Sequence, residues 1–271
     1  MTAADPMLID LVRETALTLI QQHKRPVRIG LSGAQGSGKS TLAAAIAKAD
    51  PRVAHFSLDD LYVTTVVRKA LSDKVSPLFK TRGAPGTHDL ELGKRTILQL
   101  EAARGRDRTP LPRFDKVADA PVKSPLWPQF LGTANVTLID GWCVGATPQD
   151  EADLAEPIND LEAKDDRNGA WRGYVNAQLA GPYATFFARL DAIIALDAPD
   201  FGVVEGWRME QEANLRGLAP DALPKEVRAN IERFVLHYER ITRHMLAGGR
   251  RAEIAVALDA KRQIQDIRGA V

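Results

Sequence analysis

Residues 33–40 are Gly33-Ala34-Gln35-Gly36-Ser37-Gly38-Lys39-Ser40 and fit the pattern G-x-x-x-x-G-K-[ST]. The apolar run before them, residues 27–31, predicts a buried strand, and residues 41–48 after them predict a helix. The glycines let consecutive backbone N–H groups converge on one point, where the helix N-terminus adds partial positive charge. The stretch therefore predicts a phosphate-binding loop (P-loop) for a nucleoside triphosphate. A glycine-rich turn without a ligand is the alternative.

Each polar position of this loop has an expected role. Lys39 is placed to reach the β- and γ-phosphates, and the Ser40 hydroxyl is placed to hold Mg²⁺. The residues expected to contact the nucleotide are Gly33, Ala34, Gln35, Gly36, Ser37, Gly38, Lys39, Ser40 and Thr41.

Composition limits the class of protein. The chain has 271 residues, a net charge of +1 and one cysteine, Cys143. A charge near zero argues against a nucleic-acid partner. A single cysteine cannot form an internal disulfide, so we expect a reducing compartment and a packed Cys143 side chain. No signal pattern and no run of 18 apolar residues is present, so we expect a cytoplasmic protein without a membrane partner.

Apolar strand patterns alternate with helical patterns along the chain. The predicted strands are 27–31, 53–58, 136–142, 192–196 and 254–258. The predicted helices are 5–23, 41–48, 90–103, two pieces within 151–180, 202–216 and 224–246. Residues 63–90 are expected to be irregular, and a short polar tail follows the last strand. Such alternation predicts an α/β fold with a parallel sheet covered by helices on both faces. We expect one P-loop domain over residues 1–271.

Acidic residues follow two of the predicted strands. Asp140 closes an apolar strand, which is the Walker-B arrangement for holding Mg²⁺, although a strand-end Asp in a turn is the alternative. Asp59 and Asp60 follow the strand at 53–58, which we place beside the P-loop strand. A carboxylate there can accept a proton from an attacking hydroxyl or complete the metal shell. Adjacent residues point in opposite directions, so we favour Asp59; a helix cap is the alternative for the pair.

The chain lacks the signals of a GTPase, because neither N-K-x-D nor a D-x-x-G switch after Asp140 is present. A small-molecule kinase that uses ATP is favoured. Two loops at the expected active edge carry cations, Arg82 in one and Arg113 and Lys116 in the other. Because a guanidinium grips a carboxylate with two hydrogen bonds, these cations indicate an anionic acceptor.

Two helices carry basic stripes. The helix at 202–216, extended to about 217 as a lid, places Arg208 and Arg216 on nearly one face, where they can fold over the phosphates during transfer. Pairs of Glu and Arg on a solvated face are the alternative. On the helix at 224–246, a stripe opposite the apolar face is expected to be solvated; it comprises Arg233, His237, Arg240 and His244.

Several motifs together resemble a known family. Residues 57–62, Ser57-Leu58-Asp59-Asp60-Leu61-Tyr62, resemble the S-x-D-x-F-Y segment of the uridine kinase, phosphoribulokinase and pantothenate kinase superfamily. More narrowly, the chain is similar to the plant and fungal type of D-glycerate 3-kinase from about residue 27 to 245. The segments that carry this likeness are residues 33–40, Arg82-Gly83 through Gly86-Thr87-His88-Asp89, Pro112-Arg113-Phe114-Asp115-Lys116, Asp140-Gly141-Trp142 and Trp207-Arg208-Met209-Glu210-Gln211-Glu212.

The resemblance implies ATP- and Mg²⁺-dependent phosphorylation of a small anionic hydroxy acid, D-glycerate to 3-phosphoglycerate. It implies catalytic roles for Asp59, Lys39 and Arg208, a nucleotide contact for Arg216, and Mg²⁺ neighbours at Ser40, Asp59 and Asp140. The expected acceptor contacts are Asp59, Tyr62, Arg82, His88, Asp89 and Lys116.

Two departures from the family pattern leave the acceptor open. Asp140 stands where the family usually has Glu. The family's G-x-G-D-R stretch is replaced by residues 117–123, so Lys123 can offer only a point charge. A kinase of the same fold for a nucleoside, a pantothenate-like acid or another sugar acid therefore stays possible. So does a regulatory ATP-binding protein without catalysis.

Overall fold

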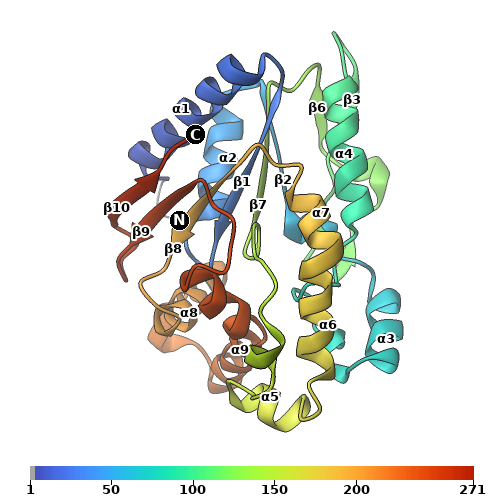
Figure 1. Cartoon of the computed structure of the whole chain (residues 1–271), viewed down its shortest axis with the longest axis vertical. Coiled ribbons are helices and arrows are strands. Elements are labelled where there is room, and N and C mark those ends of the chain that lie inside the picture. Colours follow the sequence, from blue (N-terminus) through green and yellow to red (C-terminus); the bar gives the residue numbers. More distant parts are fainter. Residues whose placement is uncertain (1–3) are drawn as a thin grey trace.

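A six-stranded sheet forms the centre of the computed structural model, which describes residues 4–271 (Figure 1). The strands lie in the order β10-β9-β8-β1-β7-β2. They are β1 (Val27–Gly33), β2 (Val53–Ser57), β7 (Val136–Gly141), β8 (Ala192–Asp197), β9 (Ile254–Leu258) and β10 (Ile264–Gly269). Strands β9 through β2 run parallel, which confirms the predicted α/β fold.

Strand β10 lies in the polar tail after residue 258, where no strand was predicted. It pairs antiparallel with β9, so the sheet is mixed and not wholly parallel. Its residues are mostly exposed and largely polar, because an edge strand needs to bury little. Apolar alternation, the usual signal of a strand, is therefore weak there.

The order of the sheet corrects a second expectation. Strand β2 pairs with β7, and β7 pairs with β1, so β7 lies between β2 and the P-loop strand. The carboxyl end of β7, with Asp140, consequently lies between the P-loop and Asp59.

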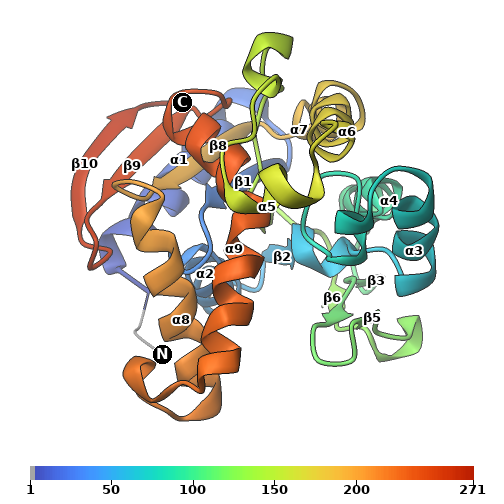
Figure 2. The ribbon, with the colours of Figure 1, turned by 90° about the horizontal axis from the view of Figure 1, so that it is seen from below.

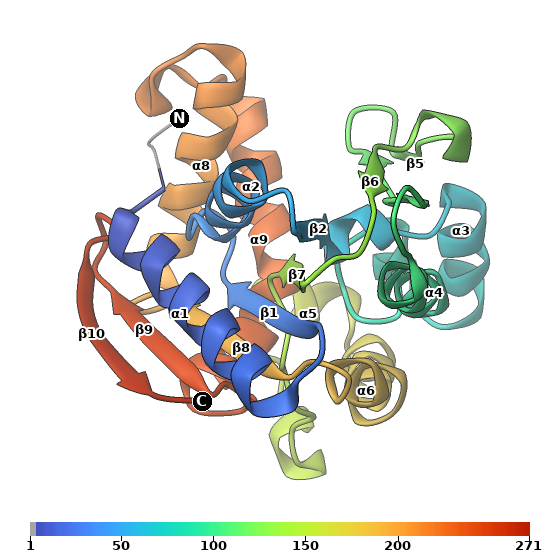
Figure 3. The same ribbon diagram turned by 90° about the horizontal axis from the view of Figure 1, so that it is seen from above.

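Alternate residues of the central strands enter two separate cores. Leu138 and Ile194 pack in one core, and their neighbours Ile139 and Ile193 pack in the other. This is the two-residue period of a sheet buried on both faces. One core is covered by α1, α2, α8 and the first half of α9; the other is covered by α4, α6, α7 and the second half of α9. In Figure 3, α1 and α6 lie on opposite sides of β1.

The helices are α1 (Pro6–His23), α2 (Lys39–Ala49), α3 (Thr65–Lys74), α4 (Leu90–Ala102), α5 (Asp160–Asp165), α6 (Ala170–Gln178), α7 (Ala184–Phe187), α8 (Gly202–Arg216) and α9 (Lys225–Leu246). Helix α1 begins as predicted, with the Asp5 carboxylate accepting a hydrogen bond from the Met7 amide and Pro6 in its first turn. Helices α8 and α9 lie side by side (Figure 2). Within residues 4–271, no helix is long and apolar enough to cross a membrane.

Helix α3 was not predicted, because its pattern is inverted. Val66 and Val67 are exposed, whereas Arg68 and Ser72 are buried. Two short antiparallel pairs follow in the same insertion between β2 and β7: β3 (Arg108–Pro110) with β6 (Gln129–Leu131), and β4 (Phe114–Asp115) with β5 (Ala120–Pro121).

The polar stripe of α9 is solvated only in part, because Arg233 is exposed as predicted but two of its members are buried. His237 and Arg240 are each only 6% exposed. Arg240 donates to both carboxylate oxygens of Glu162 at 2.8 and 2.6 Å, and to the carbonyl oxygens of Asp153 and Glu156. The prediction failed at Arg240 because its partner, on α5, lies 78 residues away in sequence.

Cys143 is fully buried, which confirms the prediction of a packed side chain. Burial raises the pKa of its thiol. The thiol therefore stays protonated and unreactive at neutral pH.

Candidate active site

The P-loop connects β1 to α2 and depends on glycines with unusual backbone angles. Gly36 has φ +79° and Gly38 has φ +95°, both in the left-handed region that other residues rarely adopt. At Gly36 space is restricted as well, since a Cβ there would lie 2.6 Å from Cβ of Trp207. Helix α8 therefore packs directly against the phosphate-binding loop.

Arg262 joins the P-loop to α8, and sequence reasoning did not find it. Its Nε donates to the carbonyl oxygen of Gly36 at 2.6 Å, its guanidinium lies 4.9 Å from the Trp207 ring centroid, and it pairs with Glu210 at 2.7 Å. The Trp207 indole also donates to the carbonyl oxygen of Ala260 at 2.8 Å. The turn between β9 and β10 thus holds the loop and the helix together.

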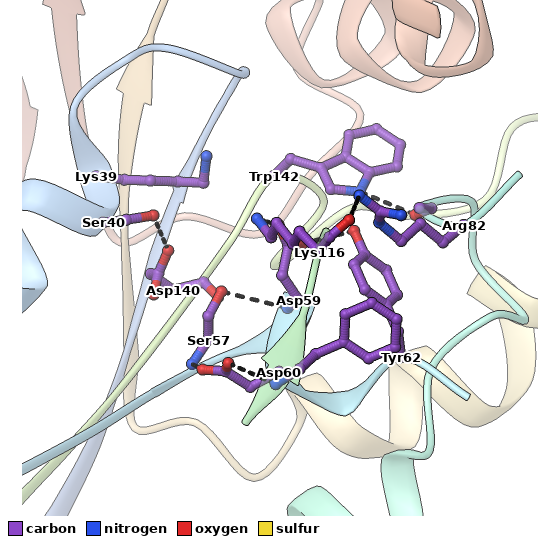
Figure 4. A network of polar contacts seen from close by, with 12 residues as sticks. Lys39, Ser40, Ser57, Asp59, Asp60, Tyr62, Arg82, Lys116, Asp140 and Trp142 are labelled. Carbon is purple, nitrogen blue, oxygen red and sulfur yellow. Dashed lines mark hydrogen bonds and ion pairs between the residues drawn. The ribbon is translucent and has the colours of Figure 1, made fainter. Parts of the chain in front are cut away.

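Lys39, Ser40 and Asp140 lie together at the carboxyl edge of the sheet (Figure 4). Burial lowers the pKa of Lys39, and the carboxylates of Asp140 and Asp59 partly offset this effect. The Ser40 hydroxyl donates to Asp140 Oδ2 at 2.5 Å. The oxygen atoms of Ser40 and Asp140 form a donor set of the type that Mg²⁺ prefers.

His55 was missed by sequence reasoning. It lies on β2, and its Nε2 lies 2.7 Å from Oδ1 of the fully buried Asp140. Asp140 is thereby held between His55 on one side and Ser40 on the other. Residue 55 faces this site only because β2 pairs with β7, which the sequence did not predict.

The two adjacent acids after β2 have different surroundings. Asp60 closes a capping box, accepting from the Ser57 amide at 2.9 Å, and it also accepts from Arg113 Nη1 at 2.9 Å. Asp59 instead accepts from Lys116 Nζ at 2.6 Å and from the Tyr62 hydroxyl at 2.7 Å. Asp60 therefore has the helix-capping role that was the alternative for the pair, whereas Asp59 lies near Lys39 of the P-loop.

The Asp59 carboxyl is ionised at neutral pH. Burial raises its pKa, but Lys116, Tyr62 and Lys39 outweigh that effect and bring the pKa down to about 2. Because it is ionised, the carboxylate can accept charge-assisted hydrogen bonds, and with so low a pKa it is a weak base.

Most of the predicted acceptor residues lie around Asp59 and Tyr62, but Asp89 does not. Lys116 contacts Asp59, and Arg82 Nη2 donates to the Lys116 carbonyl oxygen at 3.2 Å (Figure 4). His88 stacks on Tyr62, with ring centroids 4.7 Å apart. The Asp89 carboxylate instead caps α4, accepting from the Leu92 amide at 2.8 Å.

His88 is buried in a particular way. Its Nδ1 makes a hydrogen bond with the Tyr183 hydroxyl, while its Nε2 is buried without a partner among residues 4–271. Burial lowers its pKa from 6.5 to about 4. The imidazole is therefore neutral at pH 7, and its Nε2 makes no hydrogen bond with the described part of the chain.

His88 makes stability depend on pH. Between pH 6.5 and about 4 the unfolded chain binds a proton that the folded chain does not. The free energy of unfolding is therefore highest above pH 6.5 and decreases as the pH falls toward 4. This difference corresponds to about 3 kcal/mol. We expect His88→Gln to flatten the slope of unfolding free energy measured in urea between pH 4.5 and 7.5. The exposed His23→Gln should keep the wild-type slope. An unchanged slope in His88→Gln would contradict the assignment.

The two arginines of α8 share one acidic partner. Arg208 and Arg216 pair with Glu212 at 3.0 and 2.9 Å, so the predicted alternative of Glu–Arg pairs describes their present contacts. Arg208 also lies 5.9 Å from the Phe234 ring centroid, and its Nη1 is buried without a hydrogen-bond partner in the described part of the chain.

Comparison with known proteins places the chain among kinases. The chain is 31% identical to the uncharacterized kinase mug58 of Schizosaccharomyces pombe in an alignment of 228 residues, which covers 79% of this chain and 79% of that protein. It belongs to this kinase family. No family model matches the chain.

Two solved structures share the fold of this chain. D-glycerate 3-kinase from Cryptococcus neoformans superimposes with a TM-score of 0.76 at 21% identity, over 97% of this chain and 99% of that chain. The YGR205w protein superimposes with a TM-score of 0.69 at 22% identity, with the same coverage of 97% and 99%.

Proposed function

We propose that the chain transfers the γ-phosphoryl group of ATP to a hydroxyl group of D-glycerate and forms 3-phosphoglycerate. One observation carries this proposal: an ionised Asp59 lies between the P-loop lysine and a set of cations, Lys116 and Arg82. A hydroxy acid fits this arrangement, since its hydroxyl can donate to Asp59 while its carboxylate faces the cations. The fold shared with the Cryptococcus D-glycerate 3-kinase supports the choice of acceptor.

The donor side uses the P-loop. Backbone N–H groups of residues 33–40 bind the phosphates, and Lys39 neutralises charge on the transferring group. Ser40 and Asp140 would hold Mg²⁺, which when bound would neutralise charge on the phosphates. His55 and the Ser40 hydroxyl keep the Asp140 carboxylate in place for that role.

Asp59 acts on the acceptor by orientation. Phosphoryl transfer passes through a loose transition state, in which proton removal from the attacking hydroxyl contributes little to the rate. A carboxylate with a pKa of about 2 suits this task, because it accepts a hydrogen bond and aims the oxygen without needing to be a strong base.

Helix α8 completes the site as a lid. Arg208 and Arg216 pair with Glu212 at 3.0 and 2.9 Å, and either can exchange this contact for phosphate oxygens when ATP is bound. Closure would also exclude water from the γ-phosphate, which suppresses hydrolysis of ATP.

An acceptor panel tests the proposal. Purified protein is given ATP and MgCl₂ with D-glycerate, a nucleoside, pantothenate, gluconate or no acceptor, and ADP release is measured with product analysis by ³¹P NMR. We expect turnover well above the rate without acceptor only for D-glycerate. Turnover with another compound alone would refute the choice of acceptor. ATP binding with no turnover for any acceptor would favour a regulatory protein and refute catalysis.

A further inference from the structure

A small hairpin lies on the acceptor side of the proposed site. It consists of β4 and β5 and the turn between them, and its tip is open to solvent, with Val117 98% exposed. Lys116 reaches from this hairpin to Asp59 at 2.6 Å. Asp119, in the same turn, has φ +52°, a backbone conformation that Asp tolerates better than most residues.

Asp119 is held by two arginines. Its Oδ1 accepts from Arg82 Nη1 at 2.6 Å, and its Oδ2 accepts from Nη2 of Arg68. Arg68 comes from α3 and is only 1% exposed, so it anchors the carboxylate from beneath. Burial raises the pKa of Asp119, but the two arginines outweigh this and leave it lowered, so Asp119 is a charged group at neutral pH.

Asp119 sets the charge that an acceptor meets. Around the proposed acceptor position three cations, Arg68, Arg82 and Lys116, face two anions, Asp59 and Asp119. The nearby Asp60 and Arg113 pair with one another and cancel, and so do the charges of Lys39 and Asp140 on the donor side. One net positive charge remains, which matches an acceptor with one negative charge.

We propose that Asp119 is a specificity-determining residue that restricts the acceptor site to acids with a single negative charge. This inference rests on the proposed function. A phosphorylated product carries more negative charge than its acceptor, so the same carboxylate disfavours the product and promotes its release.

Loss of the Asp119 charge should affect ligands of different charge to different extents. Removing one negative charge from the site strengthens the attraction of a dianion about twice as much as that of a monoanion, because Coulomb energy scales with the charge of the ligand. A change of selectivity between the two ligands therefore reports on the charge of Asp119. A purely structural defect would weaken both ligands alike.

The experiment compares Asp119→Asn with Asp115→Asn. Asp115 lies on the same hairpin, and its carboxylate accepts from the amides of Val117 and Ala118 in the turn. Both variants lose one negative charge, but only the first loses it beside Arg82. The readout is the KM for D-glycerate and the inhibition constants of tartronate, a dianion of similar size, and of 3-phosphoglycerate.

In Asp119→Asn we expect the ratio of the glycerate KM to the tartronate inhibition constant to rise roughly tenfold, as one screened charge contact predicts. Inhibition by 3-phosphoglycerate should strengthen by at least as much. The ratio in Asp115→Asn should stay within about twofold of the wild-type ratio, and Asp119→Glu, which keeps the charge, should do the same.

An unchanged ratio in a folded Asp119→Asn variant, judged by wild-type affinity for ADP, would overturn this inference alone. If that variant does not fold, Asp119→Ser is assayed in the same way and under the same criterion. Loss of selectivity in Asp119→Glu equal to that in Asp119→Asn would also overturn it. Absence of glycerate turnover in the wild-type protein would overturn the proposed function and this inference with it.

Discussion

Asp59→Asn is expected to lower kcat by about 10³-fold while leaving the affinity for ATP within about threefold of wild type. Asn keeps the size of the side chain but removes the charge that accepts from Lys116 and Tyr62. The acceptor hydroxyl would then lose its orienting partner, whereas the P-loop contacts to the nucleotide would persist. Steady-state ADP release and fluorescence titration with a labelled ATP analogue give the two quantities separately.

Asp60→Asn is the matched control, because it makes the same change one residue further along. Asp60 serves the capping box at Ser57 and the pair with Arg113, so its replacement should lower the melting temperature and leave kcat within about threefold. Equal losses of kcat in the two variants would show that the site does not distinguish these acids. Wild-type turnover in Asp59→Asn would remove Asp59 from the mechanism.

Glu162→Ala is expected to cost about 3–5 kcal/mol of unfolding free energy. Glu162 is fully buried and Arg240 is 6% exposed, so the variant leaves a guanidinium without its carboxylate in the interior. A loss of this size is a large part of the roughly 5–15 kcal/mol that stabilises a typical domain. Urea titration monitored by circular dichroism measures it, and the melting temperature should fall by roughly 10 °C.

Two further variants show whether burial is the cause. Lys164→Ala breaks the Lys164–Asp160 pair on the same helix, where both side chains are exposed, and should change stability little. The double variant Glu162→Ala, Arg240→Met removes both buried charges and should recover part of the loss. A Lys164→Ala loss as large as that of Glu162→Ala would contradict the explanation.

Local signals in the sequence predicted much of the central fold. Helix α8 and strand β9 have the predicted bounds, and the P-loop glycines mark the junction of β1 with α2. These elements are set by apolar periodicity, caps and turn glycines within a few residues of themselves. The preference for Asp59 over Asp60 stays a prediction, because both acids lie in a short 3-10 helix, Leu58–Leu61, and not in the extended chain from which it was argued.

Features that depend on distant partners could not be predicted. Arg240 is buried because it pairs with Glu162, and Arg68 is buried where it pairs with Asp119. Both partners are distant in sequence, so the local pattern does not indicate them. His55 reaches Asp140 only through the pairing of β2 with β7. Sequence patterns predict burial on the assumption that polar residues are exposed, and buried charge pairs break this assumption. They also give no information on which strands pair.

The contact between Arg262 and Gly36 also bears on how the chain folds as it is made. The two residues are 226 positions apart, and synthesis at about 5–20 residues per second separates their appearance by roughly 10–45 s. During that interval the phosphate-binding loop exists without the side chain that holds its carbonyl group, and for most of it without helix α8, which packs on the loop. Formation of the nucleotide site is thereby coupled to the arrival of the β9–β10 hairpin, and a nascent chain acquires its ATP-binding geometry late.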